Sequence, residues 1–160
     1  LFSCYEVSKY LGVNKNSINS IIGSFILPKG RGQNININGL NIIDDSYNAS
    51  PASVKAALKN LPEGKRRIGL LGAMRELGFM QEQSHKEVGE CAVKVLDQVV
   101  CIGQECRPII EIFEQEGKGA ELFKKKEEAA ERLKEVMREG DIVLIKGSNL
   151  LKLWTILEGI

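Results

Sequence analysis

The feature that most constrains this fold is the repeated alternation of short apolar segments with longer amphipathic ones. Segments of strand length occur at 67–71, 99–102 and 141–145 and are apolar after the charged first residues Arg67 and Asp141. The segments between them carry apolar residues at helical spacing. Short apolar strands joined through helices are typical of parallel sheets that are covered on both faces. The sequence therefore predicts an α/β fold with a mostly parallel sheet.

Residue spacing also predicts where the helices of this fold lie. Pro51 opens one helix, because its fixed φ suits the first turn. Further helices are expected over residues 82–96, 105–116, 124–138 and 150–157, with a weak strand at 117–123. This order places a helix between each pair of successive parallel strands.

An antiparallel hairpin is predicted at the N-terminal side of the sheet. Residues 34–37 alternate polar and apolar side chains, and residues 40–43 supply a partner strand. Asn38-Gly39 between them is the strongest two-residue signal for a hairpin turn. The hairpin adds one antiparallel strand to an otherwise parallel sheet.

The first thirty residues differ from the rest and predict a separate unit. Two short helices are expected on either side of Gly12, the second with Phe25 among its apolar residues. The turn-rich segment PKGRG at 28–32 follows, so we divide the chain into residues 1–30 and 31–160. Two such helices cannot form a core alone. We expect them to pack on another part of a longer protein, as the absence of Met at position 1 also indicates.

The composition describes one globular domain of ordinary size. The 160 residues are 43% hydrophobic and 27% charged, a balance that can bury a core. Lys and Arg number 22 against 21 Asp and Glu, so no charge excess indicates a nucleic-acid or membrane partner. No apolar run approaches the ~20 residues of a membrane span, and no basic segment leads a secretory signal. We expect a cytoplasmic protein.

Metal ligands and nucleophile pairs are scarce in this sequence. His85 is the only histidine, which excludes metal sites built on two imidazoles, and its place early in a helix favours packing or capping over catalysis. The four cysteines form no CxxC pair, and Cys91 and Cys101 lie in apolar segments, as reduced structural thiols do. The sequence therefore indicates no metal site built on imidazoles, and no Ser–His–Asp or Cys–His arrangement can be argued from the one histidine.

Three polar loops follow predicted strands, at residues 44–48, 72–78 and 146–149. Parallel strands place their carboxyl ends on one edge of the sheet, where ligands of open α/β sheets bind. We therefore expect these loops to share a binding edge. The chain lacks both the G-x-x-x-x-G-K-[ST] and the G-x-G-x-x-G loops that would identify a complete phosphate or dinucleotide site.

Each polar loop has a plain structural interpretation beside the functional one. Asp44 and Asp45 either cap the helix near Pro51 or accept hydrogen bonds from a ribose or hold a metal. Ser148 either caps a helix or joins Lys146 in an anion site. Arg31 is a solvated turn residue or a phosphate clamp. The residues alone indicate an edge suited to a nucleotide, a phosphate or a carboxylate.

Four motifs in this order resemble those of the Mur ligase family. They are GR at 30–31, DDSYNASP at 44–51, LGAMRELG at 71–78 followed by His85, and DIVLIKGS at 141–148. The resemblance covers the whole chain, including a helical start similar to the end of the family's central domain. It implies a Rossmann-like C-terminal domain that closes over ATP bound on the central domain.

The resemblance also implies an activity and a nucleotide site. The first motif is most similar to that of members that add D-Ala-D-Ala to UDP-N-acetylmuramoyl-tripeptide, through an acyl phosphate, in peptidoglycan precursor synthesis. By motif, Asp45 would hold the ATP ribose and Arg31 would reach the phosphates. Tyr47 and Asn48 would lie beside the nucleotide.

The dipeptide is expected at the loop after the last strand. The resemblance implies that Lys146, Gly147, Ser148 and Asn149 help to place it. This chain departs from the family's usual residues at three positions, which are Ala73 for Asp, Asn149 for Arg and Ser50 for Asn. A bidentate guanidinium has no equivalent in an Asn side chain.

The resemblance places the rest of the machinery in other domains. The phosphate-binding loop and the Mg²⁺ ligands would lie on the central domain, so we expect this chain alone to be monomeric and inactive, with no catalytic residue of its own. Its partners would be the remaining domains and the two substrates, with no nucleic acid or membrane. Two alternatives stay open: a non-catalytic module that binds a small ligand or nucleotide, and a related Mur-type ligase for another amino acid or a folate.

Overall fold

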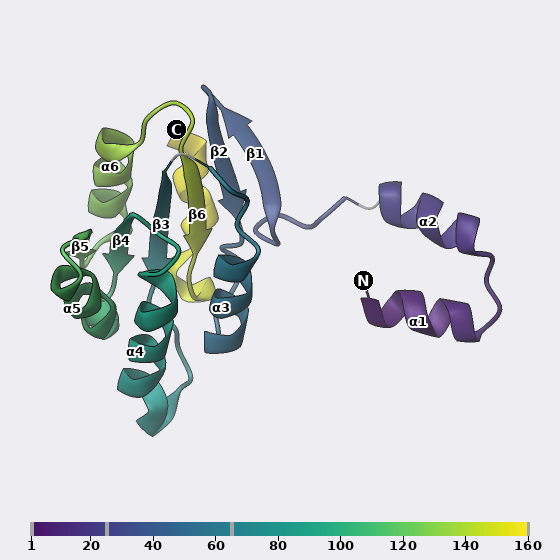
Figure 1. Cartoon of the computed structure of the whole chain (residues 1–160), viewed down its shortest axis with the longest axis horizontal. Coiled ribbons are helices and arrows are strands. Elements are labelled where there is room, and N and C mark those ends of the chain that lie inside the picture. Colours follow the sequence, from purple (N-terminus) through teal and green to yellow (C-terminus); the bar gives the residue numbers. More distant parts are fainter. Residues whose placement is uncertain (1, 25, 65, 160) are drawn as a thin grey trace.

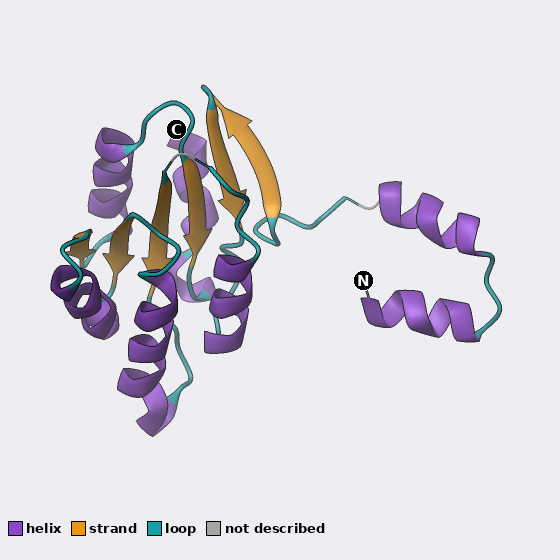
Figure 2. Cartoon of the chain, in the orientation of Figure 1, coloured by secondary structure: helices purple, strands orange, loops and turns teal. Residues whose placement is uncertain are grey.

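A six-stranded mixed sheet forms the centre of the computed structural model, which describes residues 2–24, 26–64 and 66–159 (Figures 1 and 2). The strand order is β1-β2-β6-β3-β4-β5, and only the β1–β2 pair is antiparallel. The strands are β1 (Gln33–Ile37), β2 (Leu40–Asp44), β3 (Arg67–Gly72), β4 (Gln98–Ile102), β5 (Gly119–Phe123) and β6 (Ile142–Lys146). The predicted α/β class and its N-terminal hairpin are confirmed.

Helices cover both faces of this sheet, as the sequence predicts. The α-helices are α1 (Phe2–Tyr10), α2 (Lys15–Ser24), α3 (Pro51–Lys59), α4 (Gln81–Ala92), α5 (Arg107–Gln115) and α6 (Lys126–Val136). The 3₁₀ helices are η1 (Gly78–Met80), η2 (Gln104–Cys106), η3 (Asn149–Leu151) and η4 (Leu153–Gly159). Helices α3, α4 and α5 pack on one face, and α6 and η4 pack on the other.

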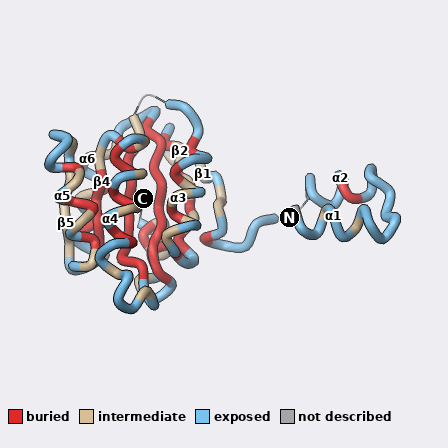
Figure 3. Tube along the Cα trace, turned by 60° about the horizontal axis from the view of Figure 1, so that its bottom comes forward, coloured by how far each residue is buried: buried red, intermediate tan, exposed pale blue. Residues whose placement is uncertain are grey.

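Strand β6 shows why both faces are covered. All five of its residues are buried. Ile142 and Leu144 join the core under α3 to α5, whereas Val143 and Ile145 join the core under α6 and η4. Successive side chains on a strand point to opposite faces, so a strand with apolar side chains on both faces needs a helical layer on each side. Figure 3 shows this buried centre in red.

The C-terminal segment differs from the predicted helix. In place of an α-helix over 150–157, the chain forms η3 and η4, and Lys152 between them has a φ of 47°, in the left-handed region. Leu153 and Ile156 are buried three residues apart, which is the spacing that aligns side chains on a 3₁₀ helix. The predicted position of this helical segment is therefore confirmed, whereas the predicted helix type is wrong.

Helices α1 and α2 form a pair that lies apart from the sheet in both views (Figures 1 and 3). Ile18 is the one buried residue of α2, while Tyr10 and Ile21 are exposed. Phe25, which we expected on the apolar side of α2, lies outside the described residues. Among the residues that the structure describes, no helix combines the length and the apolar character needed to cross a membrane.

Candidate functional site

The loop after β2 is shaped by its own side chains and by Gly30. Asp44 Oδ1 accepts hydrogen bonds from both the backbone N–H and the hydroxyl of Ser46. The Gly30 carbonyl accepts from the Tyr47 N–H at 2.9 Å. Gly30 has a φ of 74°, and a Cβ there would lie 2.9 Å from the Tyr47 nitrogen. The close approach and the left-handed backbone together require glycine at this position.

Arg31 lies directly over this loop. The central carbon of its guanidinium is 3.8 Å from the centre of the Tyr47 ring. Both side chains are exposed, and the stacking is a cation–π contact. The contact brings a positive charge to the rim of the loop, next to the turn formed by Asp44 and Ser46.

Lys146, the last residue of β6, reaches the same loop from inside the protein. Its side chain is 2% exposed, and Nζ lies 2.6 Å from Asp45 Oδ2. The same Nζ donates to the carbonyls of Asn48 at 3.0 Å and Asp45 at 3.3 Å. Asn149 Nδ2 donates to the Tyr47 carbonyl at 3.1 Å. The loop after β6 is therefore bonded to the loop after β2, because β2 and β6 are neighbours in the sheet.

One cavity of about 260 Å³ lies where these side chains meet. Its lining residues are Arg31, Asp45, Tyr47, Asn48, Ala49, Ser50, Ser53 and Lys146. The structure thus brings together the four residues expected around a nucleotide, and Lys146 beside them. The third polar loop, residues 72–78, contributes no lining residue among those described.

The other residues expected at the dipeptide lie outside this cavity. Gly147 is packed so closely that a Cβ would lie 3.0 Å from the Gly72 Cα. Ser148 is 3% exposed and holds the N-cap position of η3, but its side chain makes no capping hydrogen bond. Its Oγ has no hydrogen-bond partner among the described residues. The interpretation of Ser148 as a capping side chain is therefore wrong, and its hydroxyl keeps its hydrogen-bonding capacity.

Helix α3 begins beside the cavity, and its cap is a serine. Ser50 Oγ accepts from the Ser53 N–H, and the Ser53 hydroxyl accepts from the Ser50 N–H. The interpretation of Asp44 and Asp45 as caps of this helix is thus wrong, and both carboxylates serve the preceding loop instead. Sequence reasoning missed Ser50 and Ser53 as lining residues. A serine three residues before another at the start of a helix resembles a capping box and could have indicated them.

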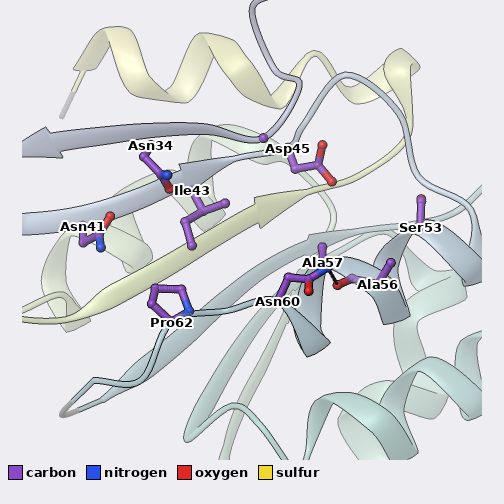
Figure 4. A pocket seen from close by; sticks show the side chains of 10 residues that line it. Asn34, Asn41, Ile43, Asp45, Ser53, Ala56, Ala57, Asn60 and Pro62 are labelled. Atoms are coloured by element: carbon purple, nitrogen blue, oxygen red, sulfur yellow. Dashed lines mark hydrogen bonds between the residues drawn. The ribbon is translucent and has the colours of Figure 1, made fainter. Parts of the chain in front are cut away.

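A second, larger groove of about 790 Å³ adjoins the first cavity and shares Asp45 and Ser53 with it (Figure 4). Its walls are one face of the hairpin, which carries Asn34, Asn41 and Ile43, and helix α3 with its C-cap Asn60. The sequence reasoning missed this groove. The alternation of Asn with Ile in the hairpin indicates a face that carries Asn side chains. This pattern does not show that helix α3 lies across the groove from that face.

His85 has a packing role, as expected. It is fully buried, its Nε2 accepts the Met74 N–H at 3.1 Å, and its Nδ1 lies 2.8 Å from the Gln81 carbonyl. Because Nε2 must accept, Nδ1 carries the proton and donates. The ring joins the loop after β3 to helix α4.

Among the described residues no group of three or more His, Cys, Asp or Glu could hold a metal ion.

Comparisons with known proteins agree on one family. The family model described as "Mur ligase, glutamate ligase domain" matches residues 30–149. The UDP-N-acetylmuramoyl-tripeptide--D-alanyl-D-alanine ligase of Rickettsia prowazekii is 32% identical over 143 residues, covering 86% of this chain and 31% of that protein. The ligase of the same name from Bacillus subtilis is 34% identical over 126 residues, covering 75% and 28%.

A solved structure shows the same fold. The MurF ligase of Thermotoga maritima in complex with ADP matches with a TM-score of 0.78 and 28% identity, over 95% of this chain and 34% of that one. The chain spans about a third of the length of these relatives. With the family model covering most of the chain and the four motifs in place, the chain belongs to the Mur ligase family.

Proposed function

We propose that this chain is the C-terminal domain of an ATP-dependent ligase that adds D-Ala-D-Ala to UDP-N-acetylmuramoyl-tripeptide. The observation that carries the proposal is the cavity that gathers Arg31, Asp45, Tyr47 and Asn48. The relatives that match most of the chain bear the name of this ligase, and one neighbour was solved with ADP. Residues 1–30 would be the end of the central domain, which would cover the exposed faces of α1 and α2.

The cavity carries side chains that could bind the ribose and the phosphates of a nucleotide. The Asp45 carboxylate suits a ribose diol, because it accepts hydrogen bonds from both hydroxyls. The guanidinium of Arg31 suits a phosphate, with which it forms charge-assisted hydrogen bonds. Tyr47 and Asn48 would flank the nucleotide. These residues would bind and orient ATP when the domain closes on the rest of the protein.

The dipeptide would bind at the loop after β6, beside Gly147, Ser148 and Asn149. Support for this side comes from the Ser148 hydroxyl, which is buried and has no partner among the described residues. A buried polar group without a partner is costly, and a ligand atom that bonds to it removes that cost. Mg²⁺ and the activation of the tripeptide carboxylate would belong to the remaining domains. The complete ligase would act as a monomer in the cytoplasm.

Release of phosphate from ATP tests this function. The complete protein that carries this chain is expected to release phosphate only when UDP-N-acetylmuramoyl-tripeptide and D-Ala-D-Ala are both present. The chain alone is expected to release none. Turnover with a single amino acid or a folate in place of D-Ala-D-Ala would identify a different ligase of the family. Absence of any turnover in the complete protein would favour a non-catalytic binding module.

A further inference from the structure

The loops after β2 and β6 are joined more closely than two neighbouring loops require. Three backbone carbonyls of the first loop, those of Asp45, Tyr47 and Asn48, each accept a hydrogen bond from a side chain of the second loop. The donors are Lys146 and Asn149, about a hundred residues further along the chain. The loop around the proposed nucleotide site is thus held from the loop assigned to the dipeptide.

Lys146 has no donor left for a ligand. An ammonium group has three N–H donors, and the three acceptors within reach are the Asp45 carboxylate, the Asp45 carbonyl and the Asn48 carbonyl. Its side chain is almost completely buried, whereas that of Asp45 is 27% exposed. The ammonium group of Lys146 therefore stabilises the loop after β2, and the Asp45 carboxylate that it binds borders the cavity.

We propose that Lys146 and Asn149 are positioning residues that hold the loop of residues 45–48 in the shape that binds nucleotide. The inference rests on the proposed function only for the identity of the ligand. It changes the role of Lys146 from a contact of the dipeptide to a support of the nucleotide side. The two loops act as one unit, so loss of either donor loosens the nucleotide loop without changing any residue that touches nucleotide.

Hydrogen exchange measures the positioning directly. The variant Lys146→Met keeps an unbranched apolar side chain as far as the ε position and removes the ammonium donors. Exchange of the Ser46 and Tyr47 amide protons is expected to become about tenfold faster, a factor that corresponds to ~1.4 kcal/mol. The amides of β4 are expected to keep their rates. A purely structural role for Lys146 would accelerate exchange across the whole sheet, and unchanged rates at Ser46 and Tyr47 would overturn the proposal.

A nucleotide titration followed by NMR supplies the second measurement. With ADP as the probe, Lys146→Met is expected to bind about fivefold more weakly than the unchanged chain under conditions where both are folded. Lys55→Met is the matched control, because Lys55 forms an ion pair of the same 2.6 Å length with Glu87, outside the cavity. Equal ADP affinity of Lys146→Met and the unchanged chain would overturn the proposal.

Asn149→Ala keeps the proposal open to refutation if Lys146→Met does not fold. Asn149 is exposed and loses a single hydrogen bond, to the Tyr47 carbonyl. Faster exchange at Tyr47 is expected, and an unchanged rate would contradict the role of Asn149. If the unchanged chain shows no response to ADP, the proposed nucleotide role fails, and the exchange rates alone then decide whether Lys146 and Asn149 position the loop.

Discussion

Gly72 and Gly147 meet at the carboxyl ends of β3 and β6, where a Cβ on Gly147 would lie 3.0 Å from the Gly72 Cα. The same Cβ would lie 2.7 Å from Leu153 Cδ1. Gly147, the glycine of the last motif, is thus required by close packing between two strands and η4. Its role in the fold is separate from any contact with a substrate.

Gly147→Ala is therefore expected to destabilise the fold. Overpacking of a tight core site costs about 1–3 kcal/mol, so urea denaturation should show a loss of this size in the free energy of unfolding. Gly23→Ala is the matched control, because a Cβ at Gly23 meets no atom within 4 Å and the residue lies in α2. The control should show no loss of stability. Equal stability of Gly147→Ala and the unchanged chain would contradict the packing described.

Removal of the Asp45 carboxylate should cost stability as well as nucleotide binding. Asp45→Ala leaves the buried ammonium of Lys146 with two carbonyl acceptors and no counter-charge. Breaking a buried ion pair from one side is strongly destabilising, and partial exposure of Asp45 reduces the cost to about 2 kcal/mol. Thermal or urea unfolding measures it.

Glu87→Ala serves as the control for that loss. It breaks the ion pair with Lys55, whose side chains are 35% and 40% exposed. Exposed pairs contribute little, because water screens their charges. If both variants lose the same stability, the Lys146–Asp45 pair is no more important to the fold than a surface pair.

Substitution by Ala should lower stability at one of two serines and not at the other. Ser148 has a buried hydroxyl without a partner among the described residues, so Ser148→Ala removes an unsatisfied group and should leave stability unchanged or raise it by up to about 1 kcal/mol. Ser50 caps α3, so Ser50→Ala should lower stability by about 1 kcal/mol. A clear loss of stability in Ser148→Ala would mean that its hydroxyl already has a partner in the fold.

The cysteines should react with thiol reagents at different rates, because they differ in exposure. Cys4 is exposed, whereas Cys101 and Cys106 are buried, and burial raises the pKa of the Cys101 thiol well above its usual range. Only the thiolate reacts quickly with thiol reagents. In the folded chain a thiol reagent should modify Cys4 rapidly and Cys101 only after denaturant is added. Rapid modification of Cys101 in the native state would contradict the core arrangement.

Most of the fold could be predicted because its signals are local. The apolar runs at β3, β4 and β6 and the Asn38-Gly39 turn identify themselves within a few residues, and the turn has both residues at positive φ. The C-terminal segment could not be assigned its helix type. An apolar spacing of three and four residues fits either kind of helix, and the left-handed Lys152 that separates η3 from η4 leaves no mark in the sequence.

The candidate site was predictable in its residues but not in their contacts. Arg31, Asp45, Tyr47 and Asn48 line one cavity, and the motifs pointed to them. The position of Lys146 depends on β6 lying beside β2, which brings together loops about a hundred residues apart. A sequence shows that a lysine is charged but not which acceptors surround it. For that reason the family resemblance led us to expect Lys146 at the dipeptide.

Chemical-shift mapping with ADP tests whether the cavity binds a nucleotide. In the isotope-labelled chain, ADP is expected to shift the amides of Arg31 and residues 45–48 first, with millimolar affinity, since most phosphate contacts would lie on the remaining domains. Asp45→Ala should abolish these shifts. Shifts centred on another face, or micromolar binding that survives Asp45→Ala, would contradict the account.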